Sequence, residues 1–355
     1  MTVLKSKLLG AACLALLTLG ACASVPSSES AAITMSADTY TVEKPLTDFT
    51  DFILVKTGPS PRIVSMDEAI NVLSEYDVVF VGEAHGHAAN HIAQSKLFAG
   101  LYAKNNNIAL SMEQFERPAQ SVLDAYLKGD IGEETLVHDG KAWPHYRSSY
   151  RPLVEFAKAN DLSVIAAEVP ANMVSCVGER GPDFLGSLSG DTRGYIADEL
   201  HLEDGPYKDK FFAFLKAAAG HHVSGNLSEA EQEKQNFYRY AAQVSRDDTM
   251  AESMALHLKE NPDRKIIHVN GSFHSAGLLG TPARLEIRVP GITMANVHPV
   301  MADDPSRPSF TQSDLAQGEY LLLISPTPKR FVQMKNINAF MARTRGEIDK
   351  DKCSY

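Results

Sequence analysis

Glutamate and histidine side chains stand where three of the predicted strands end. They are Glu83 and His85 after residues 77–82, Glu113 after 108–112, and His274 after 265–270. The first and last of these strands share one form, an apolar run followed by Gly-x-x-His. The glycine permits a sharp turn, which leaves the imidazole at the rim of the sheet. If the two strands are neighbours, we expect all four side chains to converge on one pocket.

This group of side chains can support two kinds of chemistry. Two neutral imidazoles and two carboxylates could hold a divalent metal such as zinc, with His85, Glu113 and His274 as ligands. Without a metal, the same three residues and Glu83 could act as general base and acid. For any one of them alone, a structural role is the simpler interpretation, such as pairing with Arg117 four residues after Glu113. Their joint placement favours a catalytic or binding site.

Strand and helix signals alternate along the chain, and the elements that they predict must position these side chains. Short apolar runs predict strands, and apolar residues spaced by three and four predict helices. The expected strands are 77–82, 108–112, 162–166, 265–270, 292–297 and 320–324, and the expected helices include 87–104, 118–129 and 150–159. Alternation of this kind predicts an α/β fold, with a mainly parallel central sheet flanked by helices. Ligands bind such sheets outside the carboxyl ends of the strands.

A largely helical insertion is expected at about 171–258. Its long helix starts at Ser228, which forms a capping box with Glu231. Asp248 falls within the apolar stripe of this helix, and a carboxylate on a buried face must be paired or must line a cavity. Asp248 is therefore a candidate cofactor contact. The alternative is a helix break near Arg246, with Asp248 capping a new helix.

His87 and His91 lie one helical turn apart, a spacing that can chelate a metal. They fall off the apolar stripe of the helix 87–104, so a solvated face is the simpler interpretation. His91 is kept as a candidate cofactor contact.

The amino terminus has the pattern of a secretory signal. Lys5 and Lys7 precede an apolar run over 8–19, which ends in Leu-Gly-Ala-Cys22. This ending resembles the lipobox of bacterial lipoproteins, in which the cysteine is acylated. We therefore expect a signal peptide over 1–21, a lipidated Cys22 with a flexible tether over 22–61, and one α/β domain over 62–350. The expected location is the cell envelope, on the outer membrane where the cell has two.

Composition excludes several classes of function. The net charge of −10 disfavours nucleic acid as a partner, because an acidic surface repels phosphate. The sequence lacks Gly-x-x-x-x-Gly-Lys and Gly-x-Ser-x-Gly, which disfavours a P-loop triphosphatase and a serine hydrolase. It also lacks Cys-x-x-Cys-His, which excludes covalent c-type haem. Beyond Cys22, only Cys176 and Cys353 remain, and the sequence leaves open whether they pair.

Five motifs in order resemble the ChaN family of haem-binding lipoproteins. They are Val81–His85 with Asn90 and His91, Ser111–Arg117, Trp143 with Tyr150–Pro152, Gln243 with Asp248–Ala251, and Gly271–His274. The resemblance implies an α/β domain that binds haem or an iron complex for iron acquisition, with two haems held in a homodimer. It also implies a tyrosine ligand to iron, for which Tyr150, Tyr195 and Tyr207 are the candidates. Arg117, His91 and Asp248 are the other expected cofactor contacts.

The chain is similar, more remotely, to the TIKI metalloproteases and the erythromycin esterases. Their two Gly-x-x-His motifs and a glutamate map onto His85, Glu113 and His274. The resemblance thus implies haem binding first and a metal-dependent hydrolase as the alternative. Aromatic residues of the helical insertion could wall a haem slot: Phe184, Tyr195, Tyr207, Phe211, Phe212 and Phe214. They could equally pack the insertion onto the sheet.

Overall fold

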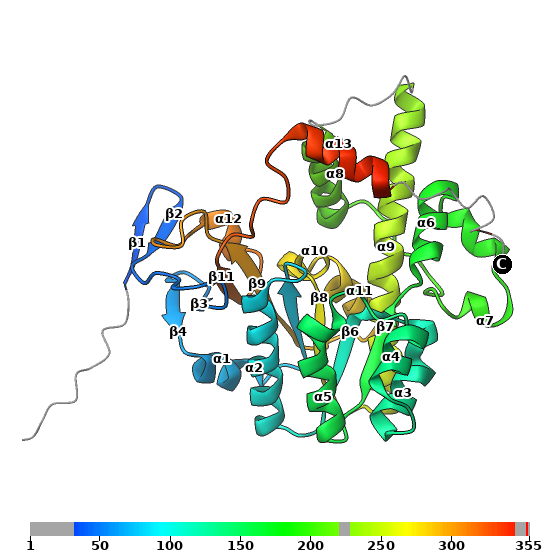
Figure 1. Ribbon diagram of the computed structural model, residues 1–355, viewed down its shortest axis with the longest axis horizontal. Helices are drawn as coiled ribbons and strands as arrows, with labels where there is room; N and C mark the ends of the chain where they lie inside the picture. Colours follow the sequence, from blue (N-terminus) through cyan, green and yellow to red (C-terminus); the bar gives the residue numbers. More distant parts are fainter. Residues whose placement is uncertain (1–31, 220–227, 345–352, 354–355) are drawn as a thin grey trace, which may run out of the picture. The chain divides into compact units, whose positions relative to one another are not determined.

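The computed structural model of the chain describes residues 32–219, 228–344 and 353. Its centre is an eight-stranded sheet with the order β4-β3-β11-β9-β5-β8-β6-β7 (Figure 1). The six strands from β11 to β7 run parallel to one another, and β3 pairs antiparallel with both β11 and β4. The predicted α/β class with a mainly parallel sheet is therefore confirmed.

The sheet has six strands that match the predicted apolar runs and two, at 52–56 and 62–64, that were not predicted. In chain order the strands are β3 (Phe52–Lys56), β4 (Arg62–Val64), β5 (Val78–Glu83), β6 (Ile108–Glu116), β7 (Val164–Glu168), β8 (Lys265–Gly271), β9 (Met294–Met301) and β11 (Tyr320–Ile324). Strand β6 continues past its expected end at Met112, so Glu113 lies inside the strand. The pairing of β6 with β7 shifts register between Met112 and Glu116, which marks an irregularity at this point.

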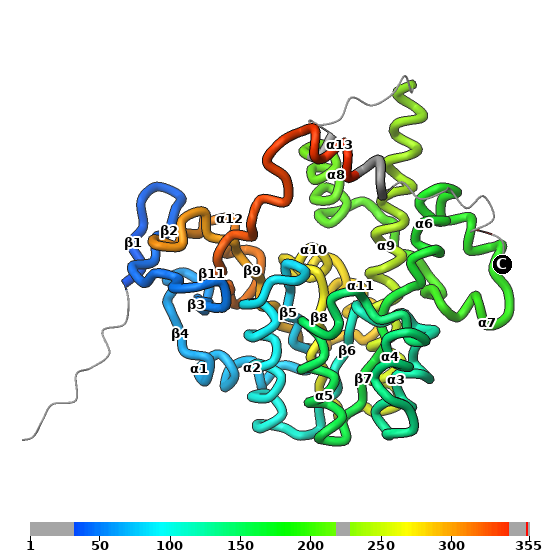
Figure 2. Tube along the Cα trace, viewed as in Figure 1, coloured from blue at the N-terminus to red at the C-terminus, as the bar shows by residue number. Residues whose placement is uncertain are grey.

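The predicted flexible tether over 22–61 is wrong between residues 33 and 56. Residues 33–56 form strands β1 (Ile33–Ser36), β2 (Thr39–Val42) and β3. Strands β1 and β2 join β10 (Ser309–Thr311) in a small antiparallel sheet. Tyr40, Val42 and Phe310 bury their side chains in a shared apolar cluster. These contacts link residues far apart in the sequence, which a local pattern does not reveal. Figure 2 shows the same relationship for β3 and β11, which lie side by side.

Two apolar layers cover the sheet, because successive residues of β5 point to opposite faces. Val79 and Val81 contribute to one core, with Ala93 and Leu97 of the next helix. This face carries helices α1 (Met66–Leu73), α2 (Ala88–Lys104), α3 (Gln120–Lys128), α4 (Glu133–Asp139) and α5 (Arg151–Ala159). Val78 and Phe80 pack into a second core with Met250 of the long helix α9.

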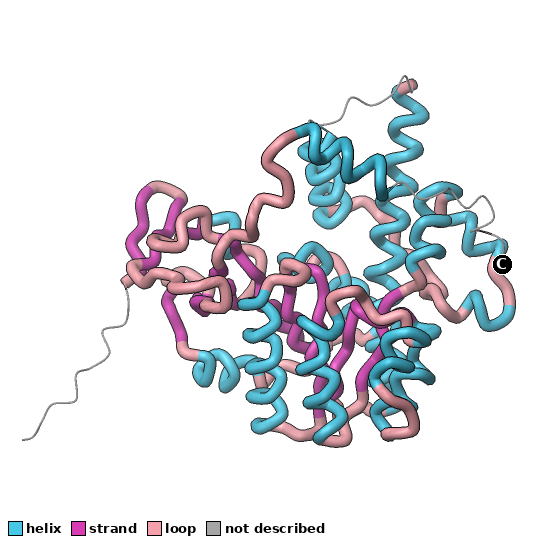
Figure 3. Tube along the Cα trace, in the orientation of Figure 1, coloured by secondary structure: helices cyan, strands magenta, loops and turns pink. Residues whose placement is uncertain are grey.

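The expected helical insertion agrees with the structure (Figure 3). It contains α6 (Ala171–Arg180), α7 (Gly190–Arg193), α8 (Pro206–Ala219) and α9 (Glu229–Glu260). Short helices α10 (Ser272–Ser275), α11 (Thr281–Arg288) and α12 (Gln312–Leu315) follow, and α13 (Met334–Thr344) lies near the carboxyl terminus. Ser228 and Glu231 form the predicted capping box, and α9 continues without a break through Arg246. The alternative of a helix break there is therefore wrong.

A disulfide joins Cys176 of α6 to Cys353, a pairing that the sequence left open. It closes a loop over 177 positions of the chain. The bond lies in an apolar cluster with Met173 and Ala241, so α6 packs against α9 where it is joined to Cys353.

Strand β7 ends the sheet, and a side chain covers part of its outer edge. The Gln120 amide donates to the carbonyl of Val164 and accepts from the backbone N–H of Ala166, at 2.9 and 2.7 Å. Within the described ranges, no helix is both long enough and apolar enough to cross a bilayer. The predicted signal peptide and Cys22 lie outside the described residues.

Candidate functional site

The two Gly-x-x-His turns meet at the carboxyl edge of the sheet, as predicted. Strands β5 and β8 are parallel neighbours, and their register pairs Glu83 with Gly271. Gly271 makes close approach possible, since a Cβ there would lie 2.9 Å from Nε2 of His85. The carboxyl ends of β5, β6 and β8 thus bring Glu83, His85, Glu113 and His274 together.

Glu113 is the centre of this group. It is fully buried, and its Oε1 accepts from Arg246 at 2.6 Å. Its Oε2 accepts from the backbone N–H of Gly271 at 2.5 Å. Nε2 of His85 and Nε2 of His274 lie 4.0 and 3.9 Å from Oε1. Burial opposes ionisation, but Arg246 and the two histidines outweigh it and lower the pKa of Glu113 to about 2.

In both histidines, the ring nitrogen Nδ1 is within hydrogen-bonding distance of a carboxylate. Nδ1 of His85 lies 2.7 Å from Oε1 of Glu83, and Nδ1 of His274 lies 2.8 Å from Oδ1 of Asp247. A proton on Nδ1 is stabilised in both pairs, which turns Nε2 of each ring toward Glu113. Burial opposes protonation, but the adjacent carboxylates raise the pKa of both histidines. His274 is buried, whereas the His85 side chain is 44% exposed.

Glu83 is fixed by several donors. It accepts from the hydroxyl of Tyr150 at 2.6 Å and from the amide of Gln94 at 2.7 Å. Tyr150 ends a π-helical turn over Tyr146–Tyr150, and burial together with Glu83 raises the pKa of its phenol. His91 is buried, with Nδ1 2.9 Å from Oε1 of Gln94. The expectation of a solvated His91 is therefore wrong, because α2 turns this side chain toward Glu83.

Asp247 is fixed in a similar way. It accepts from the hydroxyl of Tyr207 at 2.5 Å and from Thr281 at 2.9 Å. Burial and the charge of Asp247 raise the pKa of Tyr207 well above its usual value. Tyr150 and Tyr207 therefore act as protonated donors in the structure. Tyr195 lies apart from both, in the apolar cluster of α6.

The arginine beside Glu113 is Arg246, and the suggested pairing of Glu113 with Arg117 is wrong. Arg117 bonds Glu252 at 3.0 Å and Ser253 at 2.8 Å. Arg117 lies beyond the end of β6, where the chain turns after Glu116, so its side chain does not contact Glu113. Arg246 also bonds Glu168 at 2.5 Å, so one guanidinium bridges two buried carboxylates.

Asp248 is fully buried, which confirms that it points inward. Its carboxylate is occupied by protein groups. It accepts from Arg288 and from the backbone of His201 at 2.8 Å, and Nδ1 of His201 lies at the same distance. Nε of Arg284 lies 3.5 Å away. These contacts favour a structural role, and its contribution to cofactor binding stays a prediction.

Metal binding by these residues finds no support. Among the described residues, no three histidine, cysteine, aspartate or glutamate side chains are placed to hold a metal ion. Arg246 explains why, because its guanidinium bonds the Glu113 oxygen that both imidazoles face. The distances between the four predicted side chains confirm that they lie close together, and their catalytic roles stay predictions.

The six predicted slot residues do not form one wall. Phe184 and Tyr195 pack with α6, whereas Tyr207, Phe211 and Phe212 pack with Tyr240 of α9. Phe214 remains 54% exposed beside this second cluster. His221 and His222 fall outside the described residues.

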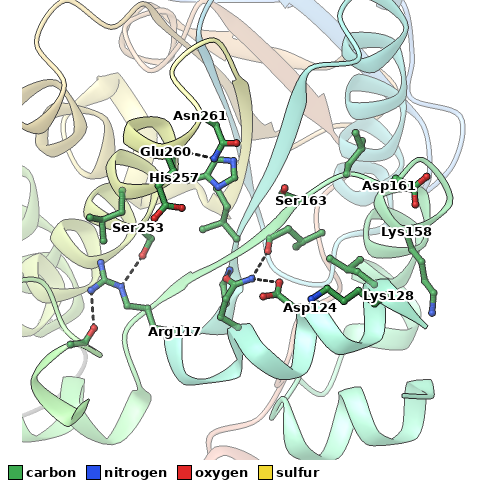
Figure 4. A pocket seen from close by; sticks show the side chains of 18 of the residues that line it. Arg117, Asp124, Lys128, Lys158, Asp161, Ser163, Ser253, His257, Glu260 and Asn261 are labelled. Atoms are coloured by element: carbon green, nitrogen blue, oxygen red, sulfur yellow. Dashed lines mark hydrogen bonds between the residues drawn. The ribbon is translucent and has the colours of Figure 1, made fainter. Parts of the chain in front are cut away.

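An open groove of about 810 Å³ lies elsewhere, along the outer edge of β7. Figure 4 shows its polar walls, where Arg117 bonds Ser253 and where Lys128 and Asp161 line the opposite side. None of the four strand-end residues lines it.

Sequence reasoning missed Arg246, Asp247 and Glu168 as parts of the site. It named Tyr207 only as a candidate iron ligand and Gln243 only within a family motif, whereas the structure places them against Asp247 and His274. One signal was available for Arg246 and Asp247. The apolar stripe of α9 is interrupted by Arg-Asp-Asp at 246–248, and all three side chains sit on a segment buried on several sides. A charged triplet within a helix that is buried between Tyr240 and Met254 indicates a polar site rather than a solvated turn.

The sequence profile of the family described as haem-binding uptake, Tiki superfamily, ChaN matches residues 69–285, more than half of the chain. The matched region contains every residue of the site. This chain belongs to that family. No curated protein matches the sequence.

Two solved structures are compared with this ChaN-family chain, and the first of them shares its fold. One, described as cofacial haem binding to ChaN of Campylobacter jejuni, is 17% identical with a TM-score of 0.58. That alignment covers 79% of this chain and all of the other. A variant of an erythromycin esterase in its open conformation is 14% identical, with a TM-score of 0.40 over 79% of this chain and 83% of the other. The second likeness is too low to support an argument about function.

Proposed function

We propose that this protein binds haem at the carboxyl edge of its sheet, with His85 facing the iron, as a lipid-anchored protein of iron acquisition. One observation carries the proposal beyond family membership. His85 is the exposed imidazole of the site, and its Nδ1 is held at 2.7 Å by the buried Glu83. Histidines that bind metals commonly donate their second ring nitrogen to a carboxylate, which fixes the ring and strengthens the ligand.

The residues around His85 fit a haem group. Trp143 stands edge-on to the imidazole, with ring centroids 5.1 Å apart, and provides an apolar surface next to it. Haem iron accepts histidine or tyrosinate as a protein ligand. The raised pKa values of Tyr150 and Tyr207 oppose the tyrosinate form, and both hydroxyls are engaged by carboxylates. The donor set therefore favours His85 over these two tyrosines.

A haemin titration tests the proposal. Purified protein should give a saturable Soret band, and His85→Ala should weaken binding or move the band. His138→Ala is the matched control, because the His138 side chain is 90% exposed and pairs with the neighbouring Asp139 instead of a residue of the site. No saturable band with the unaltered protein would refute haem binding, and an identical band in His85→Ala would refute His85 as the ligand.

Attachment to the envelope and pairing of two copies belong to the same proposal. Lipid on Cys22 would supply the membrane anchor, because two or more acyl chains give stable attachment. Cys22→Ser should then release the protein from membranes during fractionation. The related Campylobacter jejuni protein binds haem cofacially. We infer that two copies of this chain associate around haem, so haemin should increase the mass measured by sedimentation.

Acid–base hydrolysis without a metal is the second candidate function. The observation that favours it is the pair of carboxylate-anchored imidazoles, whose Nε2 atoms face one ionised glutamate. Such a pair could supply a base for water and an acid for the leaving group. A panel of carboxylic esters tests it, with chelator present. Turnover that persists in chelator and is lost in His274→Ala would support hydrolysis, and no turnover of any ester would exclude it for that class.

A further inference from the structure

Lys210 of α8 places an ammonium group beside the site. Its Nζ donates to the carbonyl of Phe273 at 3.3 Å and to that of Ala276 at 3.2 Å. It also lies 4.5 Å from the centre of the Phe273 ring. Within the described part of the chain, no carboxylate forms an ion pair with it. Lys208, two residues earlier, does form an ion pair, with Asp204 at 2.5 Å.

An ammonium without a counter-ion is unusual in an acidic protein. The two carbonyls use two of its three N–H donors, which leaves one donor available. Burial lowers the pKa of Lys210 to about 8, and the charge of Asp247 only partly opposes this effect. A bound carboxylate would supply the missing negative charge, and a charge-assisted hydrogen bond of this kind is stronger than a neutral one.

An exposed aromatic side chain lies next to this cation. Phe214 follows Lys210 by one helical turn and is 54% exposed. Its ring centroid is 5.6 Å from that of Phe273. The surface therefore combines a cation with an apolar face, which suits a ligand that carries a carboxylate on a flat apolar body.

The same surface is connected to the proposed iron-binding side chain. Gly271, which packs against His85, is only two residues before Phe273. Helix α10 therefore joins the His85 contact at one end to the Lys210 contact at the other.

We propose that Lys210 binds a carboxylate arm of the tetrapyrrole, with Phe214 against its apolar edge. This inference rests on the proposed haem function. The competing explanation is structural, because a lysine that bonds the last carbonyls of a short helix also stabilises the helix end.

The test compares haemin with its dimethyl ester, which keeps the iron and the ring but lacks both carboxylates. Binding of each to the purified full chain is followed by absorbance titration. The unaltered protein should bind haemin at least about tenfold more tightly than the ester, which is about 1.4 kcal/mol. Lys210→Met should lose that preference by weakening haemin binding alone. Lys210→Arg should keep it, because it retains the cation.

Lys208→Met is the matched control, since it removes a neighbouring cation of the same helix. Thermal unfolding of each variant reports the structural role separately. If Lys210→Met is destabilised but still prefers haemin to the ester as strongly as the unaltered protein, Lys210 is only a helix cap and the inference is wrong. If the unaltered protein binds neither compound, the haem proposal itself fails. If the unaltered protein binds both compounds with equal affinity, the role of Lys210 is refuted while haem binding stands.

Discussion

Nε2 of His85 and Nε2 of His274 lie 4.0 and 3.9 Å from the same oxygen of Glu113. Both distances exceed a hydrogen bond, so neither ring is tied to Glu113 directly. Glu83 holds one ring and Asp247 the other. Protonation of either histidine adds a positive charge beside Glu113, and this charge opposes protonation of the second ring. The two residues should therefore titrate as a coupled pair.

Asp247→Asn should flatten part of the pH dependence of stability. Asp247 and Glu113 outweigh burial and raise the pKa of His274. His274 in the folded, ligand-free protein therefore keeps a proton that it would release at about pH 6.5 in the unfolded chain. The stability gained is fully present below that pH and is lost as pH rises through the raised pKa. Removing the carboxylate should make this decline in the free energy of unfolding shallower, as measured by urea denaturation at a series of pH values.

His85 also has a raised pKa, so the comparison needs a background without it. In His85→Gln, only His274 of this pair remains to titrate, and adding Asp247→Asn should still flatten the decline. A slope that does not change on adding Asp247→Asn would show that Asp247 does not control the proton on His274.

Gly271→Ala should disturb the ligand site more than the fold. The new Cβ would lie 2.9 Å from Nε2 of His85 and 3.5 Å from Oε2 of Glu113. The His85 ring can move, because it is 44% exposed, so we expect a stability loss below about 1 kcal/mol. Haemin binding should weaken, with a shifted Soret band. Gly132→Ala is the control, because nothing lies within 4 Å of its added methyl group. A fold-destabilising Gly271→Ala with unaltered haemin binding would contradict this expectation.

Cys353→Ser should lower the free energy of unfolding by about 2–4 kcal/mol, because the bond to Cys176 constrains the unfolded chain. Urea denaturation with and without reductant measures this. Reduced protein should match Cys353→Ser, and Cys176→Ser should give the same loss without further loss in the double variant. Insensitivity of the unaltered protein to reductant would show that the bond contributes nothing to stability.

Asp248→Ala should destabilise the protein by about 3–5 kcal/mol, because it leaves the buried charges of Arg284 and Arg288 without their partner. Haemin affinity, measured on the folded fraction, should stay unchanged. Asp198→Ala is a suitable comparison, since its side chain is 88% exposed and should cost little. Weakened haemin binding with full stability would restore Asp248 as a cofactor contact.

The strand-end residues could be predicted because their positions follow from local rules. Apolar runs identify β5 and β8, and a glycine at each end predicts where His85 and His274 project. Parallel neighbouring strands then bring the two together. The capping box at Ser228 is equally local, because its two partners are three residues apart.

The rest of the site depends on how distant segments pack. Asp247 becomes the partner of His274 only because α9 crosses the ends of the strands, and their separation of 27 residues gives no local signal. Arg246 reaches Glu113 over 133 residues, whereas the nearer Arg117 turns away. The strands at 33–56 form because β10 and β11 return to pair with them, so their own short apolar pattern was insufficient.

The covered outer edge of β7 bears on how the protein behaves when crowded. An exposed edge strand offers a row of unpaired donors and acceptors to which another chain can add, which begins edge-to-edge aggregation. Gln120 occupies two such groups of β7, and the opposite edge strand β4 is only three residues long. Neither edge offers a long template for strand addition. Many copies confined to one surface could therefore stay separate, and association between them would have to use side-chain surfaces instead of a shared sheet.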